Sequence, residues 1–273
     1  MATRQTPATS VPVNLTTRLF LVQPLSVRRL NRPQITVVLA MSADGKIADA
    51  SQAAARFSSA TDKAHLEAQI AKADATLFGA GTLRAYGTTL SVTTASLIEE
   101  RRSRHQLDQP IQIVCSAIGN LDPRWPFFRQ SVPRWLITTL EGMQSWHEER
   151  KKKEREKESE RPFDHVLITE RPFNWHTVMQ DLLTGKSALS TAASRPAIQN
   201  LVVMGGGELV ASLLSDGFVD DLYLTICPLL IGGKTAPTPV GGLGFILPRT
   251  PQLTLKSCQV AADEVFLHYS VCR

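Results

Sequence analysis

Seven short apolar runs between residues 35 and 227 constrain the fold more than any other feature of this sequence. The runs are rich in β-branched residues and lack the strict polar–apolar alternation of a strand with one wet face. They are ITVVLAM (35–41), ATLFG (75–79), IQIVC (111–115), RWLIT (134–138), HVLIT (165–169), NLVVM (200–204) and LYLTIC (222–227). Such runs are typical of strands covered on both faces, so they predict a parallel sheet between two layers.

Helical patterns lie between several of these runs. Thr61 is placed to cap a helix that runs to about Ala73, with Asp62 in its first turn. A second helix is expected from Glu208, where leucines recur at helical spacing. Alternation of strands and helices predicts an α/β layered fold.

The C-terminal part of the chain has a different pattern. The segments LTLKSCQV (253–260) and EVFLHYSV (264–271) flank a short Ala-Ala-Asp turn, which is typical of an antiparallel hairpin. The sequence therefore predicts a single α/β domain over residues 34–273. Its central sheet is expected to be mostly parallel, with helices on both faces and a C-terminal antiparallel hairpin.

Three segments depart from that pattern. Residues 1–33 are rich in Ser, Thr, Pro and Arg without an acidic residue, which predicts a flexible N-terminal tail and leaves an organelle transit peptide open. Residues 141–162 contain the charged run HEERKKKEREKESER, and residues 185–197 are rich in Gly, Ser, Ala and Pro. We expect both to be surface insertions, the first of them a solvated helix without an apolar face.

Composition argues against several classes of protein. The formal net charge is +5, but no aromatic residues are interleaved with Lys or Arg as they are in single-strand nucleic-acid binders. No apolar stretch reaches about eighteen residues, so we expect a cytoplasmic protein with neither a membrane nor a nucleic acid as partner. The four cysteines form no CxxC pair and the six histidines no HxxxH spacing, so no metal site is expected.

Two glycine clusters follow predicted strands. Gly79-Ala80-Gly81-Thr82 ends the run at 75–79, and Gly205-Gly206-Gly207 follows the run at 200–204 and opens a predicted helix. Glycine lets backbone amides approach a ligand closely, and a helix N-terminus favours a phosphate. Because the carboxyl ends of parallel strands meet at one edge of a sheet, the clusters predict a crevice for a pyrophosphate-bearing cofactor. No GxGxxG follows the first strand, unlike in an ordinary Rossmann dehydrogenase.

The first predicted strand ends in Met41-Ser42-Ala43-Asp44-Gly45-Lys46. An Asp-Gly pair favours a tight turn, which is one interpretation of this segment. The other places Ser42, Asp44 and Lys46 at the rim of the same crevice. The residues alone leave both interpretations open.

Several of these segments, taken in order, resemble a known family. ITVVLAMSADGKIA, RFSS, ADATLFGAGTL and VVMGGGELVASLLSDGFVDDLYLTICPLLIGGKTAPTPVGGLGF are similar to the riboflavin-biosynthesis reductases. This is the dihydrofolate-reductase-like domain that also forms the C-terminal half of bifunctional deaminase–reductases. The resemblance spans residues 34–272 apart from the two insertions.

The resemblance implies a homodimeric reductase that uses NADPH. It implies reduction of a 5-amino-6-ribosylamino-pyrimidine 5′-phosphate to its ribitylamino form. By position, it assigns the cofactor to Ala40, Gly79, Gly81, Thr82, Gly205, Gly206, Gly207, Glu208 and Leu209. It assigns the substrate to Ser42, Phe57, Ser58 and Ser59, and a catalytic role to Asp44.

Two positions depart from the family pattern. Family members commonly carry an Asp-Asp-Pro or Asp-Asn-Pro run shortly after the GxGT turn, where this chain reads LRAYGTT (83–89). They commonly carry Glu before the glycine triplet, where this chain has Met204. Both changes remove acidic groups that hold a polar ligand. They favour two alternatives: a reductase of the same fold with another substrate, such as a pterin, or a non-catalytic nucleotide-binding relative.

Overall fold

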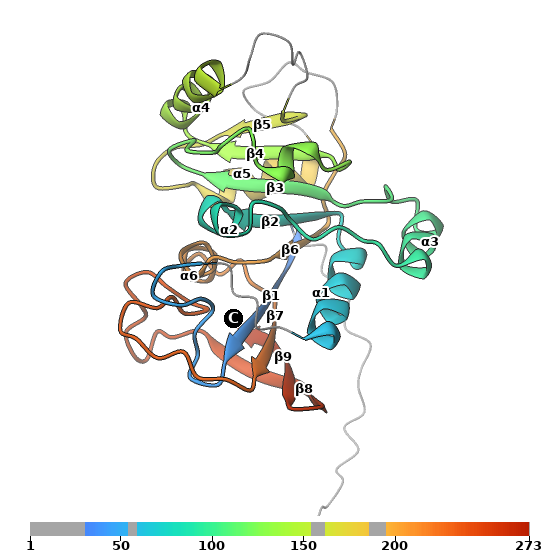
Figure 1. The fold of residues 1–273 in the computed structure, drawn as a ribbon, viewed down its shortest axis with the longest axis vertical. Coiled ribbons are helices and arrows are strands. Elements are labelled where there is room, and N and C mark those ends of the chain that lie inside the picture. Colours follow the sequence, from blue (N-terminus) through green and yellow to red (C-terminus); the bar gives the residue numbers. More distant parts are fainter. Residues whose placement is uncertain (1–30, 54–58, 154–161, 186–194, 273) are drawn as a thin grey trace, which may run out of the picture.

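The computed structural model describes residues 31–53, 59–153, 162–185 and 195–272, and these form a nine-stranded sheet (Figure 1). The strands follow in space as β5-β4-β3-β2-β6-β1-β7-β9-β8. Their bounds are β1 (Gln34–Ser42), β2 (Ala75–Gly79), β3 (Ile111–Ser116), β4 (Arg134–Thr138), β5 (His165–Ile168), β6 (Asn200–Val203), β7 (Asp221–Cys227), β8 (Gln252–Ala261) and β9 (Glu264–Cys272).

The sheet is parallel from β5 to β7 and antiparallel at its C-terminal edge. β1 lies between β6 and β7, and Val37 pairs with Val203 on one side and with Leu222 on the other. β9 runs antiparallel to both β7 and β8. The predicted mostly parallel sheet with a C-terminal hairpin is therefore confirmed.

Helices cover both faces of the sheet, as expected. Alternate residues of β1 separate the two layers, because Ile35 and Val37 pack with α5 and α6 while Val38 packs with α1. On the α1 side, α2 and α4 cover Phe78 and Leu136. The bounds are α1 (Ala60–Lys72), α2 (Ala80–Tyr86), α3 (Ala95–Ser103), α4 (Leu140–Lys153), α5 (Trp175–Thr184) and α6 (Gly207–Ser215), with a 3₁₀ turn at Pro126–Arg129.

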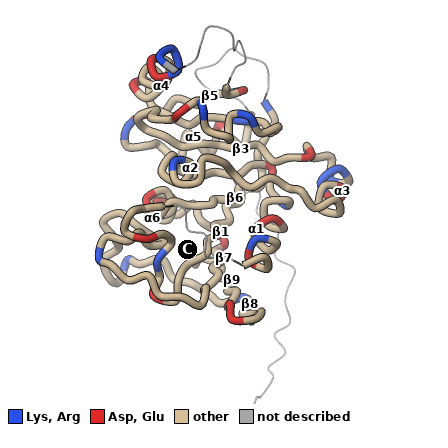
Figure 2. The backbone as a smooth tube through the Cα atoms, viewed as in Figure 1, with Lys and Arg blue, Asp and Glu red and all other residues tan. Residues whose placement is uncertain are grey.

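Helix α4 corrects the prediction of a solvated helix without an apolar face in residues 141–162. Trp146 is 2% exposed and stacks on Phe128, with ring centroids 5.4 Å apart. Met143 packs in the same cluster. These two residues precede the charged run, stand three apart and form a narrow apolar stripe along the helix. Figure 2 shows residues of both charges along α4. Residues 154–161 lie outside the described ranges.

The N-terminus of α1 also differs from the prediction. Ser59 caps this helix in place of Thr61, and its side-chain oxygen accepts a hydrogen bond from the amide of Asp62 at 3.1 Å. The Ser59 backbone has the extended conformation of a cap residue, whereas Thr61 is already helical. Ser59 also donates from its amide and hydroxyl to the buried carboxylate of Glu264, which ties α1 to β9.

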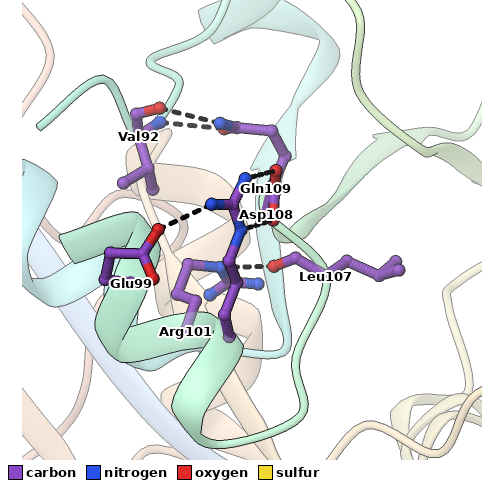
Figure 3. A network of polar contacts seen from close by, with 7 residues as sticks. Val92, Glu99, Arg101, Leu107, Asp108 and Gln109 are labelled. Atoms are coloured by element: carbon purple, nitrogen blue, oxygen red, sulfur yellow. Dashed lines mark hydrogen bonds and ion pairs between the residues drawn. The ribbon is translucent and has the colours of Figure 1, made fainter. Parts of the chain in front are cut away.

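A polar network fixes the segment between α2 and α3 (Figure 3). Gln109 bonds both backbone groups of Val92, at 2.7 and 2.9 Å. Arg101 is 1% exposed, and its guanidinium donates to the carbonyls of Leu107 and Ala73. Glu67 of α1 accepts from the amide of Thr94 at 2.7 Å. These contacts hold the segment that follows α2 against α1.

One residue of the predicted N-terminal tail is tied to the sheet domain by an ion pair. Arg32, placed in the expected tail, forms a bidentate ion pair with Asp220, with the shorter contact at 2.8 Å. Residues 1–30 and 186–194, which include most of that tail and of the expected 185–197 loop, lie outside the described residues.

Candidate active site

The carboxyl ends of β2, β6 and β1 meet beside one cavity of about 550 Å³. The two glycine turns lie against each other there, since the amide of Gly79 donates to the carbonyl of Gly205 at 3.0 Å. The cavity lies on the α1 and α2 side of the sheet. Its lining residues are Val38, Leu39, Ala40, Ile47, Asp62, Lys63, Leu66, Phe78, Thr82, Tyr86, Thr88, Thr89, Leu90, Met204, Gly205 and Gly206.

The three glycines after β6 have different local requirements. Gly205 has a φ of +100°, a conformation that L side chains rarely adopt. A Cβ on Gly206 would meet nothing closer than Thr82 Oγ1 at 3.6 Å, so space lies open above this backbone. A Cβ on Gly207 would lie 2.4 Å from the carbonyl oxygen of Thr238. Gly206 therefore leaves room for a ligand, whereas Gly207 serves close packing of the chain on itself.

The predicted cofactor residues fall into two groups. Ala40, Thr82, Gly205 and Gly206 line the cavity, and Gly79 and Gly81 belong to the adjoining turn. Gly207, Glu208 and Leu209 do not line it. The carboxylate of Glu208 accepts from the amide of Gly242 at 2.8 Å, and Leu209 is buried in the main core. These last residues hold α6 in place instead.

Asp44 is held by hydrogen bonds from two parts of the chain. Its carboxylate accepts from Ser42 Oγ at 2.7 Å and from the amides of Ile231 and Gly232 at 3.0 and 2.6 Å. These bonds, that of Ser42 first, lower the pKa of Asp44 from 3.8 to about 2. Neither Ser42, which is fully buried, nor Asp44 lines the cavity. This arrangement suits positioning of the 229–232 loop better than proton donation.

Of the other predicted substrate residues, Ser59 does not line the cavity. Ser59 caps α1 and bonds Glu264, as above. Phe57 and Ser58 lie outside the described residues.

Both departures from the family pattern lie in the cavity. Tyr86, Thr88 and Thr89 line it where the acidic run would stand, and Met204 lines it at the end of β6. Met204 packs toward the clusters of Phe78 and of Val38. The cavity wall is therefore uncharged at the positions where an acidic group was expected.

Sequence reasoning missed two charged lining residues, Asp62 and Lys63. A helix that follows a parallel strand begins at the carboxyl edge of the sheet, so its first turn faces the crevice. That rule predicts that the start of α1 belongs to the site. Asp62 is 6% exposed, whereas Lys63 is exposed.

The site fits a dinucleotide in its donor groups. α6 begins at the cavity with Gly206 as a cap that has no side-chain hydrogen bond, and the hydroxyl of Thr82 faces the same corner. Uncapped amides at a helix N-terminus are suited to a phosphate. Thr82, Gly205 and Gly206 are thus the residues that would hold the pyrophosphate.

Beyond the cavity, the described residues hold few other features of a functional site. They contain no group of three or more His, Cys, Asp or Glu side chains that could hold a metal ion. All four cysteines are free thiols, and Cys258 and Cys272 are exposed. No described helix is both long and apolar enough to cross a bilayer.

A parallel sheet with two glycine turns bordering one cavity at its carboxyl edge is the architecture of an α/β domain that binds a dinucleotide. The family model described as the RibD C-terminal domain matches residues 33–267, so the chain belongs to that family. The resemblance found in the sequence is confirmed. Since its relatives are reductases, the chain is an oxidoreductase.

Individual relatives agree with this assignment. The chain is 28% identical over 233 residues to 2,5-diamino-6-ribosylamino-4(3H)-pyrimidinone 5′-phosphate reductase of Archaeoglobus fulgidus, covering 85% of this chain and 93% of the relative. It is 27% identical to riboflavin biosynthesis protein RibD of Actinobacillus pleuropneumoniae, covering 88% of this chain but 57% of that protein. A pyrimidine reductase-like protein of Corynebacterium diphtheriae shares the fold, with a TM-score of 0.69, 21% identity and coverage of 89% and 93%.

Proposed function

We propose that this protein reduces a ribosylamino-pyrimidine 5′-phosphate to the ribitylamino form with NADPH as the hydride donor. The observation that carries the proposal is the cavity in which two glycine turns border an apolar pocket at the carboxyl edge of the sheet. The named activity of the Archaeoglobus fulgidus relative, which aligns over most of both chains, supports the substrate class.

The chain's own residues would divide the work. When bound, NADPH would supply a hydride to C1′ of the ribosyl group, while the C1′–O4′ bond opens and a proton from solvent reaches O4′. Thr82, Gly205 and Gly206 would bind the pyrophosphate of NADPH through backbone and hydroxyl donors. Val38, Phe78 and Met204 would exclude water around the rings. We also propose that the enzyme acts as a homodimer, as the family resemblance implies, and that it is located in the cytoplasm.

The test is a spectrophotometric assay of NADPH consumption with purified protein. It should use 5-amino-6-ribosylamino-uracil 5′-phosphate and its 2,5-diamino-pyrimidinone counterpart, with NADH as the alternative donor. Turnover with either pyrimidine and a lower KM for NADPH than for NADH is expected. Saturable NADPH binding without oxidation of NADPH by either substrate would refute the substrate assignment.

A second candidate is a reductase of the same fold with a different substrate, such as a pterin. Met204 favours it, because an apolar side chain stands where a carboxylate would bond a polar ring. Losing one such charge-assisted hydrogen bond weakens binding by roughly 1.5–3 kcal/mol. A dihydropterin tested beside the two pyrimidine phosphates separates the candidates. Faster NADPH consumption with the pterin would favour the second.

A further inference from the structure

Lys63 is the one basic side chain among the described residues that line the cavity. It is exposed, and within the described ranges no acidic group forms an ion pair with it. The neighbouring Asp62 also lines the cavity but has a partner of its own. An unpaired ammonium at the mouth of a cavity is a suitable contact for an anionic ligand group.

The position of Lys63 is set by the fold. α1 follows β1 and starts at the carboxyl edge of the sheet, where Lys63 is the fourth helical residue. The amide ends of the first turn add positive potential there, offset in part by the carboxylate of Asp62. α1 packs on β1 and β6, whereas α2 packs on β2 and β3. Lys63 and Thr82 therefore approach the cavity from different helices.

Several other lining residues are apolar. Leu66 and Val38 come from α1 and β1, and Met204 comes from the end of β6. The glycine turns offer backbone donors to the cavity, and Lys63 offers it a full positive charge from α1. A ligand with a ring and a terminal phosphate would match these groups, with its ring against the apolar side chains.

We propose that Lys63 binds the 5′-phosphate of the substrate and so selects phosphorylated over unphosphorylated compounds. The inference rests on the proposed function for the identity of the substrate. It requires only that a phosphate ester bind at the α1 end of the cavity, however. It can therefore be tested with a small phosphate ester as well as by turnover.

The first experiment is calorimetric titration of the NADP⁺-saturated protein with ribose 5-phosphate, and with ribose as the uncharged probe. Lys63→Gln should weaken ribose 5-phosphate binding about tenfold or more, since it removes one charge-assisted contact. Lys63→Arg should retain most of the affinity. Lys72→Gln is the matched control. It removes the same charge from the last turn of α1, about 13 Å along the helix axis.

The second experiment compares KM for the ribosylamino-pyrimidine with and without its phosphate. Lys63→Gln should raise KM only for the phosphorylated substrate and leave kcat within about twofold. Equal affinity of the wild type, Lys63→Gln and Lys72→Gln for ribose 5-phosphate would overturn the inference, as would no binding by the wild type. Ribose 5-phosphate binding that depends on Lys63, without turnover of either pyrimidine, would support the phosphate contact and refute the proposed substrate.

Discussion

Replacing Gly206 with aspartate should weaken NADPH binding about thirtyfold while leaving the fold intact. A Cβ at this position meets no atom closer than 3.6 Å, and the backbone has a φ of −75° that any residue can adopt. Gly206 is also the N-cap of α6, a position where aspartate is favourable. The melting temperature of Gly206→Asp should therefore stay near that of the wild type.

The loss of affinity follows from charge. Two unit charges about 4 Å apart interact by roughly 4 kcal/mol at an effective dielectric constant of about 20. Because the cavity is open to water, screening reduces this, and we take ~2 kcal/mol as the expected repulsion between the new carboxylate and a pyrophosphate. That energy corresponds to a weakening of about thirtyfold. Fluorescence titration with NADPH measures it directly.

Two further variants test whether the cofactor binds at these turns. Thr82→Asp places a carboxylate in the same corner from the other turn, so it should weaken NADPH binding by a similar factor. Gly207→Ala should instead lower stability, because Gly207 does not line the cavity. Its methyl group would lie 2.4 Å from the Thr238 oxygen, so stability should fall by about 1–3 kcal/mol. Wild-type affinity in both folded aspartate variants would mean that the cofactor does not bind at these turns.

Three other predictions concern stability and pH. Arg101→Ala should cost about 2–4 kcal/mol in the free energy of unfolding measured with urea, because buried carbonyls lose their donor. Trp146→Ala should cost about 3–5 kcal/mol, whereas the exposed Lys152→Ala should change stability little, and equal effects would contradict the packing of α4. Hydrogen bonds lower the pKa of Asp44 from 3.8 to about 2 on folding, so its stabilisation is complete above 3.8 and is lost as the pH falls toward 2. Asp44→Asn should flatten the pH dependence of Tm in that window.

The fold could be predicted because its signals are local. Each buried strand is a continuous apolar run, and every predicted run coincides with an observed strand to within about a residue at each end. The hairpin of β8 and β9 followed from two alternating segments and a short turn. The order of the strands did not follow, because the position of β1 between β6 and β7 depends on contacts between residues far apart in sequence.

The misjudged elements share a physical cause, which is tertiary contact. Ser59 rather than Thr61 caps α1 because Glu264, from the last strand, fixes the Ser59 backbone and hydroxyl. α4 packs because Phe128, from another element, offers a ring to Trp146. Neither partner could be identified from the local sequence. The same holds for Glu208, whose carboxylate bonds the amide of Gly242 instead of pointing to a ligand.

The two departures from the family pattern are best understood as one change. Tyr86 is the last residue of α2 and Met204 directly follows β6, yet both line the same cavity. The glycine turns beside them are retained, and a Cβ on Gly206 would still meet no atom closer than 3.6 Å. A protein that bound no cofactor would need neither the glycine turns nor the acidic positions of the family pattern. This chain keeps the first and replaces the second. Retained cofactor geometry next to an altered wall therefore points to a reductase whose ring pocket has changed, and KM rather than NADPH affinity should report that change.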